Sequence, residues 1–178
     1  PNREGFWKAC QTEIKTLEDM DVWEVVARQS WMNVLPGTWA FKIKRFPDGL
    51  IRKLKARFCL RGDKQIYGTD FFDTYAAVVK WETVRLMLVL SAQLSLATKQ
   101  VDFTAAFVHA DIDLPPGYEN LTQEEKDRSG VYVEMPRGFA EPGKVLKLKK
   151  NLYGLKQAPR NWGKHRDENL KAVGFRQC

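Results

Sequence analysis

The spacing of apolar and polar positions predicts a chain that mixes helices with strands. Apolar residues recur at helical spacing over residues 5–20 and, with no interrupting Gly or Pro, over residues 81–97. Residues 39–44 alternate apolar and basic side chains, as a half-exposed strand does, and residues 51–60 repeat the alternation after a Pro-Asp-Gly turn signal. We therefore expect a basic β-hairpin over residues 39–61.

Shorter elements complete the expected structure. The pattern predicts strands over 23–26, 99–103, 131–133 and 145–148, a short helix capped by Thr104 over 104–110, and a helix over 159–172. Residues 113–130 are acidic, poor in apolar residues and broken by Pro and Gly, so we expect a surface loop there. Because strands and helices follow one another without a βαβ rhythm, the predicted fold class is α+β.

Composition restricts the class of protein further. The 178 residues are 44% hydrophobic and include six Trp and ten Phe, which argues against a disordered chain. Three widely spaced cysteines without a C-x-x-C pair favour neither a disulfide scaffold nor a structural zinc site, and they suit a reducing compartment. We assign Trp7, Trp23, Trp39 and Trp81 to the core, because large aromatic side chains are mostly structural.

The chain has no sequence feature that directs it to a membrane or out of the cell. No apolar run approaches the roughly 20 residues of a membrane-spanning helix, and no leader precedes the first helix. We therefore expect an intracellular protein that is not secreted and not bound to a membrane. Pro1 and Cys178 do not resemble natural ends, so we also expect the chain to be a fragment.

Charge is unevenly distributed within a formal net charge of +7. Residues 41–65 carry nine basic and two acidic side chains, residues 144–178 carry ten and two, and residues 101–143 carry three and nine. Two basic segments around an acidic one suit a groove for a polyanion that holds a carboxylate site. A solvated surface explains the same charges equally well when charge alone is considered.

Two local motifs have chemical content. In residues 100–107, Asp102 ends an apolar strand candidate, where its carboxylate can bind Mg²⁺ or cap the next helix, and Phe107 suits either the floor under a bound sugar or the core. In residues 149–162, a Gly turn between basic groups precedes a Pro at a helix start. That arrangement presents backbone N–H groups and cations to phosphate, or forms a turn with a solvated basic face.

Taken together, these segments resemble the reverse transcriptase domain of copia-type LTR retrotransposon polyproteins, in order and along nearly the whole chain. The matching strings are Phe6-Trp7-Lys8-Ala9, Trp23-Glu24-Val25-Val26, Trp39-Ala40-Phe41-Lys42-Ile43-Lys44-Arg45, Lys55-Ala56-Arg57-Phe58-Cys59-Leu60-Arg61-Gly62, Gln100-Val101-Asp102-Phe103-Thr104-Ala105-Ala106-Phe107, Val131-Tyr132-Val133 and Leu152-Tyr153-Gly154-Leu155-Lys156-Gln157-Ala158-Pro159-Arg160-Asn161-Trp162. The chain departs from the family at Ala77, at Ala110 and in residues 114–130, which look like an insertion. The family's Tyr-Val-Asp-Asp hairpin would follow Cys178.

The resemblance implies the fingers and part of the palm of a right-hand polymerase. Residues 1–80 would form a fingers-like region with the 39–61 hairpin. Residues 81–178 would form a partial palm with returning fingers elements, truncated before the Tyr-x-Asp-Asp hairpin. The implied reaction is template-directed DNA synthesis from RNA or DNA by two-metal-ion nucleotidyl transfer.

The resemblance also implies roles for individual residues. Asp102 would be the catalytic metal ligand for two Mg²⁺ ions, with Mn²⁺ as the alternative, and the Phe103 carbonyl would be a further ligand. The nucleotide-binding residues would be Lys42, Lys44, Arg57, Phe107, Tyr153 and Gly154. The template- and primer-binding residues would be Lys156, Gln157, Arg160 and Trp162.

The implied partners are a primed RNA or DNA template, deoxynucleoside triphosphates, and flanking integrase and RNase H domains, in a cytoplasmic particle or the nucleus. One carboxylate cannot hold two hard dications well, so we expect the isolated chain to be inactive. The alternative function is a non-enzymatic nucleic-acid-binding remnant of a mobile element. A structural or protein-interaction domain derived from such an element is a third.

Overall fold

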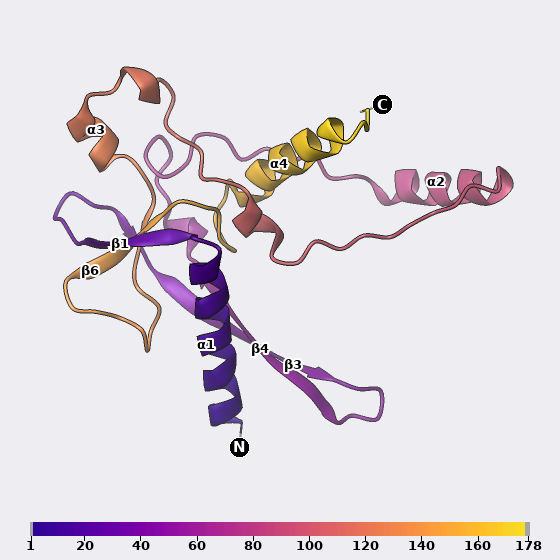
Figure 1. Cartoon of the computed structure of the whole chain (residues 1–178), viewed down its shortest axis with the longest axis horizontal. Coiled ribbons are helices and arrows are strands. Elements are labelled where there is room, and N and C mark those ends of the chain that lie inside the picture. The colour runs from indigo at the N-terminus through magenta and orange to yellow at the C-terminus, as the bar shows by residue number, and fades with distance from the viewer. Residues whose placement is uncertain (1, 177–178) are drawn as a thin grey trace.

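The computed structural model describes residues 2–176, apart from the side chain of residue 127. Helices and strands are mixed along the chain, which confirms the α+β class (Figure 1). In chain order the elements are α1 (Arg3–Asp19), β1 (Trp23–Ala27), β2 (Val34–Leu35), β3 (Gly37–Arg45), β4 (Ile51–Leu60), η1 (Gly62–Lys64), α2 (Trp81–Gln93), η2 (Ala106–His109), η3 (Tyr118–Asn120), α3 (Gln123–Arg128), β5 (Tyr132–Val133), β6 (Lys144–Leu148) and α4 (Ala158–Ala172), where η denotes a 3₁₀ helix.

Four short strands form one sheet in the order β1-β6-β5-β2. β6 pairs antiparallel with both β1 and β5, whereas β2 pairs parallel with β5. β2 has only two residues, too few for a periodic pattern, and the sequence did not predict it. The sheet takes strands from both sides of the expected boundary at residues 80 and 81, and that domain division stays a prediction.

β3 and β4 form a separate antiparallel hairpin, which confirms the predicted hairpin over residues 39–61. Trp39 lies opposite Phe58 on one face, which carries the apolar side chains. Lys42 lies opposite Lys55 on the other. Since side chains alternate between the faces of a strand, the second face is a basic face, formed by Lys42, Lys44, Lys53, Lys55 and Arg57.

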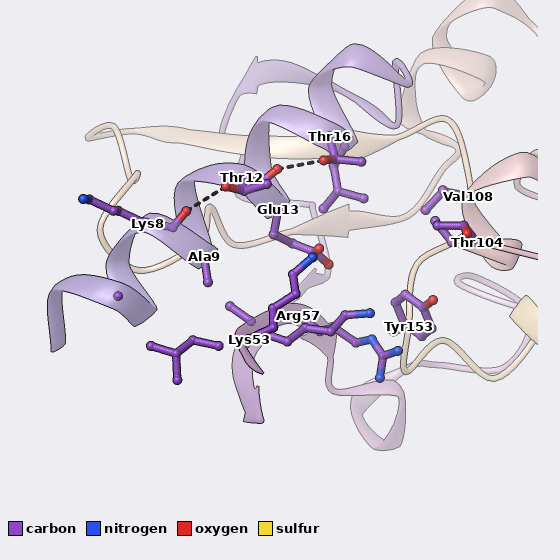
Figure 2. Close-up of a pocket in the computed structure, with 16 residues that line it drawn as sticks. Lys8, Ala9, Thr12, Glu13, Thr16, Lys53, Arg57, Thr104, Val108 and Tyr153 are labelled. Atoms are coloured by element: carbon purple, nitrogen blue, oxygen red, sulfur yellow. Dashed lines mark hydrogen bonds between the residues drawn. The ribbon is translucent and has the colours of Figure 1, made fainter. Parts of the chain in front are cut away.

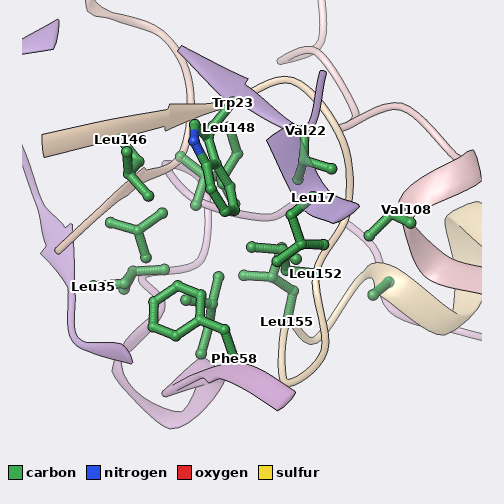
Figure 3. Packing of buried hydrophobic residues seen from close by; sticks show 14 of the residues in the cluster. Leu17, Val22, Trp23, Leu35, Phe58, Val108, Leu146, Leu148, Leu152 and Leu155 are labelled. Carbon is green, nitrogen blue, oxygen red and sulfur yellow. The ribbon is translucent and has the colours of Figure 1, made fainter. Parts of the chain in front are cut away.

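The hydrophobic core lies where the sheet meets α1, the base of the hairpin and the chain after β6 (Figure 3). Leu17 of α1 and Phe58 of β4 are almost fully buried there. Leu152 and Leu155 are buried in the same cluster and anchor the segment that follows β6, which we call the basic turn (residues 149–157). The hairpin and the basic turn are therefore fixed to one core.

Two expectations about the middle of the chain are wrong. The strand expected over residues 99–103 is absent, so Asp102 does not end a strand. A strand needs a hydrogen-bonded neighbour, and in the described part of the chain no strand lies beside this segment. The helix expected over residues 81–97 forms but ends at Gln93, shortly before Ser95 takes a left-handed φ of 53°.

The surface loop expected over residues 113–130 contains two helical turns, so that expectation was wrong in part. α3 begins with a capping box in which the Thr122 side chain and Glu125 bind each other's backbone N–H groups. The Thr-x-x-Glu pattern in the sequence is typical of such a helix start, and it was missed in the prediction of a loop. The short helix expected over residues 104–110 is a 3₁₀ helix preceded by a left-handed Ala105, and Thr104 does not cap it.

Of the four tryptophans assigned to the core, two lie in or against it and two are exposed. Trp23 is buried, and Trp39 is half-buried against the core. Trp7 and Trp81 are 45% and 71% exposed, so their assignment to the core was wrong. Within residues 2–176, no helix combines the length and the apolar character needed to cross a membrane.

Candidate functional site

One cationic and two aromatic side chains, from segments far apart in the sequence, lie together beside the hairpin. The Cζ atom of Arg57, on β4, lies 5.1 Å from the centroid of the Tyr153 ring, on the basic turn. Phe107, on η2, meets the same ring edge-on at 5.2 Å between centroids. These three side chains, which we call the row, place a guanidinium and two aromatic rings next to one another, an arrangement suited to a ligand with both phosphate and ring groups.

Close backbone contact holds Tyr153 in this position. The Leu60 N–H donates to the Tyr153 carbonyl at 2.8 Å, so the basic turn extends the open edge of β4. Gly154 has a φ of +96°, and a Cβ atom there would lie 2.1 Å from the Leu60 carbonyl oxygen. Gly62 faces the Gly154 carbonyl oxygen at a similar 2.0 Å from its ideal Cβ position. Only glycine fits at these two positions.

Hydrogen bonds among buried polar side chains hold the basic turn in place. The Gln65 amide donates to Gln157 Oε1 at 2.9 Å, and the Gln157 amide donates to the Asp70 carbonyl at 3.0 Å. The Lys156 N–H donates to Gln65 Oε1 at 2.8 Å. Gln157 is only 2% exposed, so its side chain is occupied by protein partners.

Asp70 closes the network at its other end. Its Oδ2 atom accepts from the Asn33 amide at 2.6 Å and from the Ile66 N–H at 2.8 Å, while the buried Oδ1 atom has no hydrogen-bond partner. Burial raises the pKa of this carboxyl, although its two hydrogen bonds act in the opposite direction. No local sequence signal indicated that the side chains of Gln65 and Asp70 are buried together.

The residues expected to contact template and primer have different surroundings. Lys156 is exposed, with its Nζ atom 4.6 Å from the Phe71 ring centroid. Arg160 donates to Asp73 at 2.8 Å and to Asp113 at 2.7 Å, and its side chain is 17% exposed. No pattern in the sequence indicates these two carboxylate partners.

Asp102 lies in an exposed segment between α2 and η2. The neighbouring Phe103 packs edge-on against Trp162 of α4 at 5.1 Å, which ties this segment to the helix. Among the described residues, no three His, Cys, Asp or Glu side chains are grouped so that they could hold a metal ion. The Asp102 carboxylate and the Phe103 carbonyl are oxygen ligands of the kind that Mg²⁺ prefers, but they form only part of the set that two ions need.

Like charges face each other across the basic face of the hairpin. Lys44 lies opposite Lys53, as Lys42 lies opposite Lys55, and directly opposed like charges destabilise a strand pair. Burial and the Arg57 charge lower the pKa of Lys55. An anion bound at this face would relieve the repulsion.

Comparison with known proteins gives consistent matches. Residues 20–178 match the family model described as reverse transcriptase (RNA-dependent DNA polymerase). The chain is 35% identical over 178 residues to the retrovirus-related Pol polyprotein from transposon TNT 1-94 of Nicotiana tabacum, an alignment that covers 98% of this chain and 12% of the relative. It is 31% identical over 176 residues to the corresponding polyprotein from transposon RE1 of Arabidopsis thaliana, covering 97% and 11%.

A more distant relative is the transposon Ty1-DR5 Gag-Pol polyprotein of Saccharomyces cerevisiae, which is 30% identical over 186 residues, covering 99% of this chain and 9% of the relative. The chain thus spans about a tenth of the length of these relatives, between 9% and 12%. No solved structure matches it.

Proposed function

Because this chain belongs to the reverse transcriptase (RNA-dependent DNA polymerase) family, we propose that it forms the fingers and the first part of the palm of a right-hand polymerase within a longer polyprotein. In this proposal the polyprotein copies a primed RNA or DNA template with deoxynucleoside triphosphates. The observation that carries the proposal is the row of Arg57, Tyr153 and Phe107, which comes from three segments separated in the sequence.

The nucleotide half of the site lies along this row. The Arg57 guanidinium donates to triphosphate oxygens, and Lys42 and Lys44 add positive charge from the same face of the hairpin. Phe107 packs against the sugar and disfavours a 2′-hydroxyl. Gly154 contributes by letting the basic turn approach Leu60, which brings the Tyr153 ring under Arg57.

In this proposal, Asp102 and the Phe103 carbonyl supply the metal ligands at the reacting end of the site. When bound, two Mg²⁺ or Mn²⁺ ions would hold the nucleotide and activate the primer 3′-hydroxyl. The contact between Phe103 and Trp162 orients the segment that carries Asp102. Because this chain contributes only part of the ligand set, we propose that it does not polymerise in isolation.

The nucleic-acid half of the site is the start of α4 and the basic turn. Lys156 is exposed and binds a template phosphate directly. Gln157 acts through the buried network that fixes the turn, and Arg160 acts through its two carboxylate partners, which hold the flanking segments against α4. Integrase and RNase H regions of the polyprotein, in a cytoplasmic particle or the nucleus, complete the proposed setting.

The test is nucleotide incorporation on a primed RNA template with Mg²⁺ or Mn²⁺. We expect no extension by the 178-residue chain, and extension by a longer polyprotein segment that contains the Tyr-x-Asp-Asp hairpin. In the longer protein, Asp102→Asn should abolish extension and leave template binding nearly unchanged, because it removes a metal ligand and no phosphate contact. Clear synthesis by the short chain, or by the Asp102→Asn protein, would show that the active site lies elsewhere.

A further inference from the structure

Phe107 and Tyr153, the two rings of the row, belong to segments that meet at one end of a groove of about 510 Å³. Thr104 and Val108, which lie on either side of Phe107 in the sequence, line that end together with Tyr153 and Arg57 (Figure 2). The two rings are 5.2 Å apart between centroids. The distance between the two segments therefore determines how much room remains beside the Phe107 ring.

The segment that carries Phe107 has little structure of its own to hold it. η2 has only four residues, and the hydrogen bonds of a 3₁₀ helix are poorer than those of an α-helix. Residues 94–104 before it belong to no helix or strand. Ala105 has a left-handed φ of 53°, a conformation that a residue other than glycine keeps only where its surroundings fix it. The position of Phe107 must therefore depend on contacts from outside η2.

Asn151 of the basic turn supplies such contacts to the chain that leaves η2. Its Nδ2 atom donates to the Ala110 carbonyl at 3.0 Å and to the Asp111 carbonyl at 2.8 Å. Its backbone N–H also donates to the Ala110 carbonyl, at 3.0 Å. The Ile112 N–H donates to the Lys149 carbonyl at 3.0 Å, so the two segments run antiparallel over a short stretch. One side chain thus joins the end of η2 to the basic turn.

The side chain of Asn151 is fully occupied by protein partners. Asn151 is completely buried, and its Oδ1 atom accepts from the Asn161 amide of α4 at 3.3 Å. It therefore does not contact a bound nucleotide. It lies two residues before Tyr153, and the two carbonyls that it binds lie three and four residues after Phe107. A shift of the backbone at Asn151 would change the distance between the two rings.

We propose that Asn151 is a positioning residue that holds Phe107 at its distance from Tyr153, and that it thereby sets how strongly the nucleotide site excludes a 2′-hydroxyl. This inference rests on the proposed function, in which Phe107 packs against the sugar of the nucleotide. If the end of η2 moves away from the basic turn, the Phe107 ring moves with it and space opens beside the sugar. The ligands admitted by that space are ribonucleoside triphosphates.

The test is incorporation of dCTP and of CTP, which differ only in the 2′-hydroxyl, by the longer polyprotein segment that contains the Tyr-x-Asp-Asp hairpin. Asn151→Ala should lower the ratio of kcat/KM for dCTP to that for CTP roughly tenfold, since displacements on the order of 1 Å change rates by up to about a hundredfold. Asn151→Ser is a second variant in case Asn151→Ala fails to fold. Its hydroxyl keeps a donor for one carbonyl, so it should lower the ratio by less. An unchanged ratio in the Asn151→Ala protein, or in the Asn151→Ser protein if only that one folds, overturns the inference.

Two controls separate positioning from a general loss of stability. Asn120→Ala makes the same substitution at an exposed position and should change neither the stability nor the ratio. Leu146→Ala empties a buried position that lies well away from Val108 in the core (Figure 3), so it should lower the stability and leave the ratio unchanged. If the ratio falls equally in the Leu146→Ala protein, the preference for dCTP follows stability and the inference is wrong.

A second measurement, on the 178-residue chain, needs no catalysis. Urea denaturation gives the stabilities of the Asn151→Ala, Phe107→Ala and doubly substituted chains. If Asn151 holds the two rings together, Asn151→Ala already loses part of the contact between them, so the double substitution should cost less than the sum of the single ones. Asn151→Ala combined with Leu146→Ala should give additive losses. Additive losses for Asn151 and Phe107 as well would mean that the position of Phe107 does not depend on Asn151.

The inference and the proposed function fail in different experiments. If the losses at Asn151 and Phe107 are not additive but the longer segment does not synthesise DNA, Asn151 positions the rings, and the proposed function is wrong together with the selectivity assigned to this site. If the longer segment synthesises DNA and its preference for dCTP is unchanged by Asn151→Ala, the function stands and the inference is wrong.

Discussion

The Arg57 guanidinium lies over the ring of Tyr153, 5.1 Å from its centroid, although one residue is on β4 and the other follows β6. The backbone positions of the two residues are fixed relative to each other. The Leu60 N–H binds the Tyr153 carbonyl, and the buried Leu152 and Leu155 fix the basic turn to the core. A rigid backbone thus brings a cation and a flat ring to one place before any ligand arrives, which lowers the entropy lost on binding.

The first prediction tests that backbone contact. Gly154→Ala adds a Cβ atom 2.1 Å from the Leu60 carbonyl oxygen at a φ of +96°, so the turn must move away from β4. We expect a loss of stability of at least about 1–3 kcal/mol, the usual range for strained backbone, and weaker dTTP binding. Chemical denaturation measures the first effect and calorimetry the second.

Gly163→Ala is the matched control for this substitution. Gly163 lies inside α4, with open space where a Cβ atom would go, so alanine should stabilise the helix by up to about 1 kcal/mol. Equal effects of the two substitutions would mean that the close approach of Gly154 to Leu60 does not matter.

The second prediction concerns Gln157. If its role is to hold the basic turn, Gln157→Ala leaves the Gln65 amide and the Asp70 carbonyl without this partner in a buried place. That loss should lower the free energy of unfolding by about 1–3 kcal/mol. Gln11→Ala, at an exposed position of α1, should change it by less than about 0.5 kcal/mol. Unchanged stability together with weaker template binding would instead favour direct contact with nucleic acid.

The third prediction separates Lys156 from Arg160 by the salt dependence of nucleic-acid binding. Lys156→Ala should weaken primer–template binding and reduce the slope of log affinity against log salt by roughly 1, as one phosphate contact is lost. Arg160 is already neutralised by Asp73 and Asp113, so Arg160→Ala should lower stability and leave the slope nearly unchanged. Fluorescence anisotropy at several salt concentrations measures both slopes. A flat response of the wild-type chain would exclude a phosphate-binding groove.

The parts of the fold that the sequence predicted are those whose signals are local. The hairpin is one example, because alternation around a Pro-Asp-Gly turn fixes both strands and their register in a short stretch of chain. Residues 99–103 are the opposite case, since an apolar segment becomes a strand only when a neighbour supplies hydrogen bonds. α3 had a local signal, the Thr122–Glu125 capping box, in a segment whose acidic composition favoured a loop.

In the candidate site, too, some residues could be predicted from the sequence and others could not. The resemblance to the reverse transcriptase family selected Arg57, Tyr153 and Phe107, which the structure then brings together. The partners of Arg160 and the surroundings of Gln157 depend on contacts between segments far apart in the sequence, and no local pattern encodes them. Glu13 was one polar residue of a helix in the sequence, and only the folded chain shows that two cations of β4, Lys55 and Arg57, lie close to it.

The fourth prediction is a pH dependence that originates at Asp70. Its pKa is raised in the folded protein, so the native state binds a proton at this carboxyl more readily than the unfolded chain does, and the contribution of Asp70 to stability should rise as the pH falls from neutral towards the ordinary value of 3.8. The unpartnered Oδ1 atom can take the proton without breaking the two hydrogen bonds at Oδ2.

Urea denaturation of the wild-type chain and of Asp70→Asn, between about pH 7 and about pH 4, isolates this contribution. Because the asparagine side chain of the variant does not titrate, the wild-type chain should gain stability relative to the variant as the pH falls. A difference between the two proteins that stays constant over this range, or that changes in the opposite direction, would show that burial does not raise the pKa of Asp70.

The last prediction concerns α2, which projects away from the rest of the structure (Figure 1). None of its residues is buried, and its exposed apolar side chains include Leu86, Met87 and Val89, which are 56%, 57% and 53% exposed. Since these side chains contribute no packing to the core, replacing Leu86 and Val89 by Lys should change the free energy of unfolding by less than about 0.5 kcal/mol per site. An uncovered apolar helix promotes association, so the same double variant should sediment as a smaller species than the wild-type chain in analytical ultracentrifugation.

Phe58→Ala is the contrasting control, because it empties a fully buried site and should lower stability by about 3–5 kcal/mol. A large loss of stability in the Leu86→Lys, Val89→Lys protein would mean that α2 packs against the core in solution.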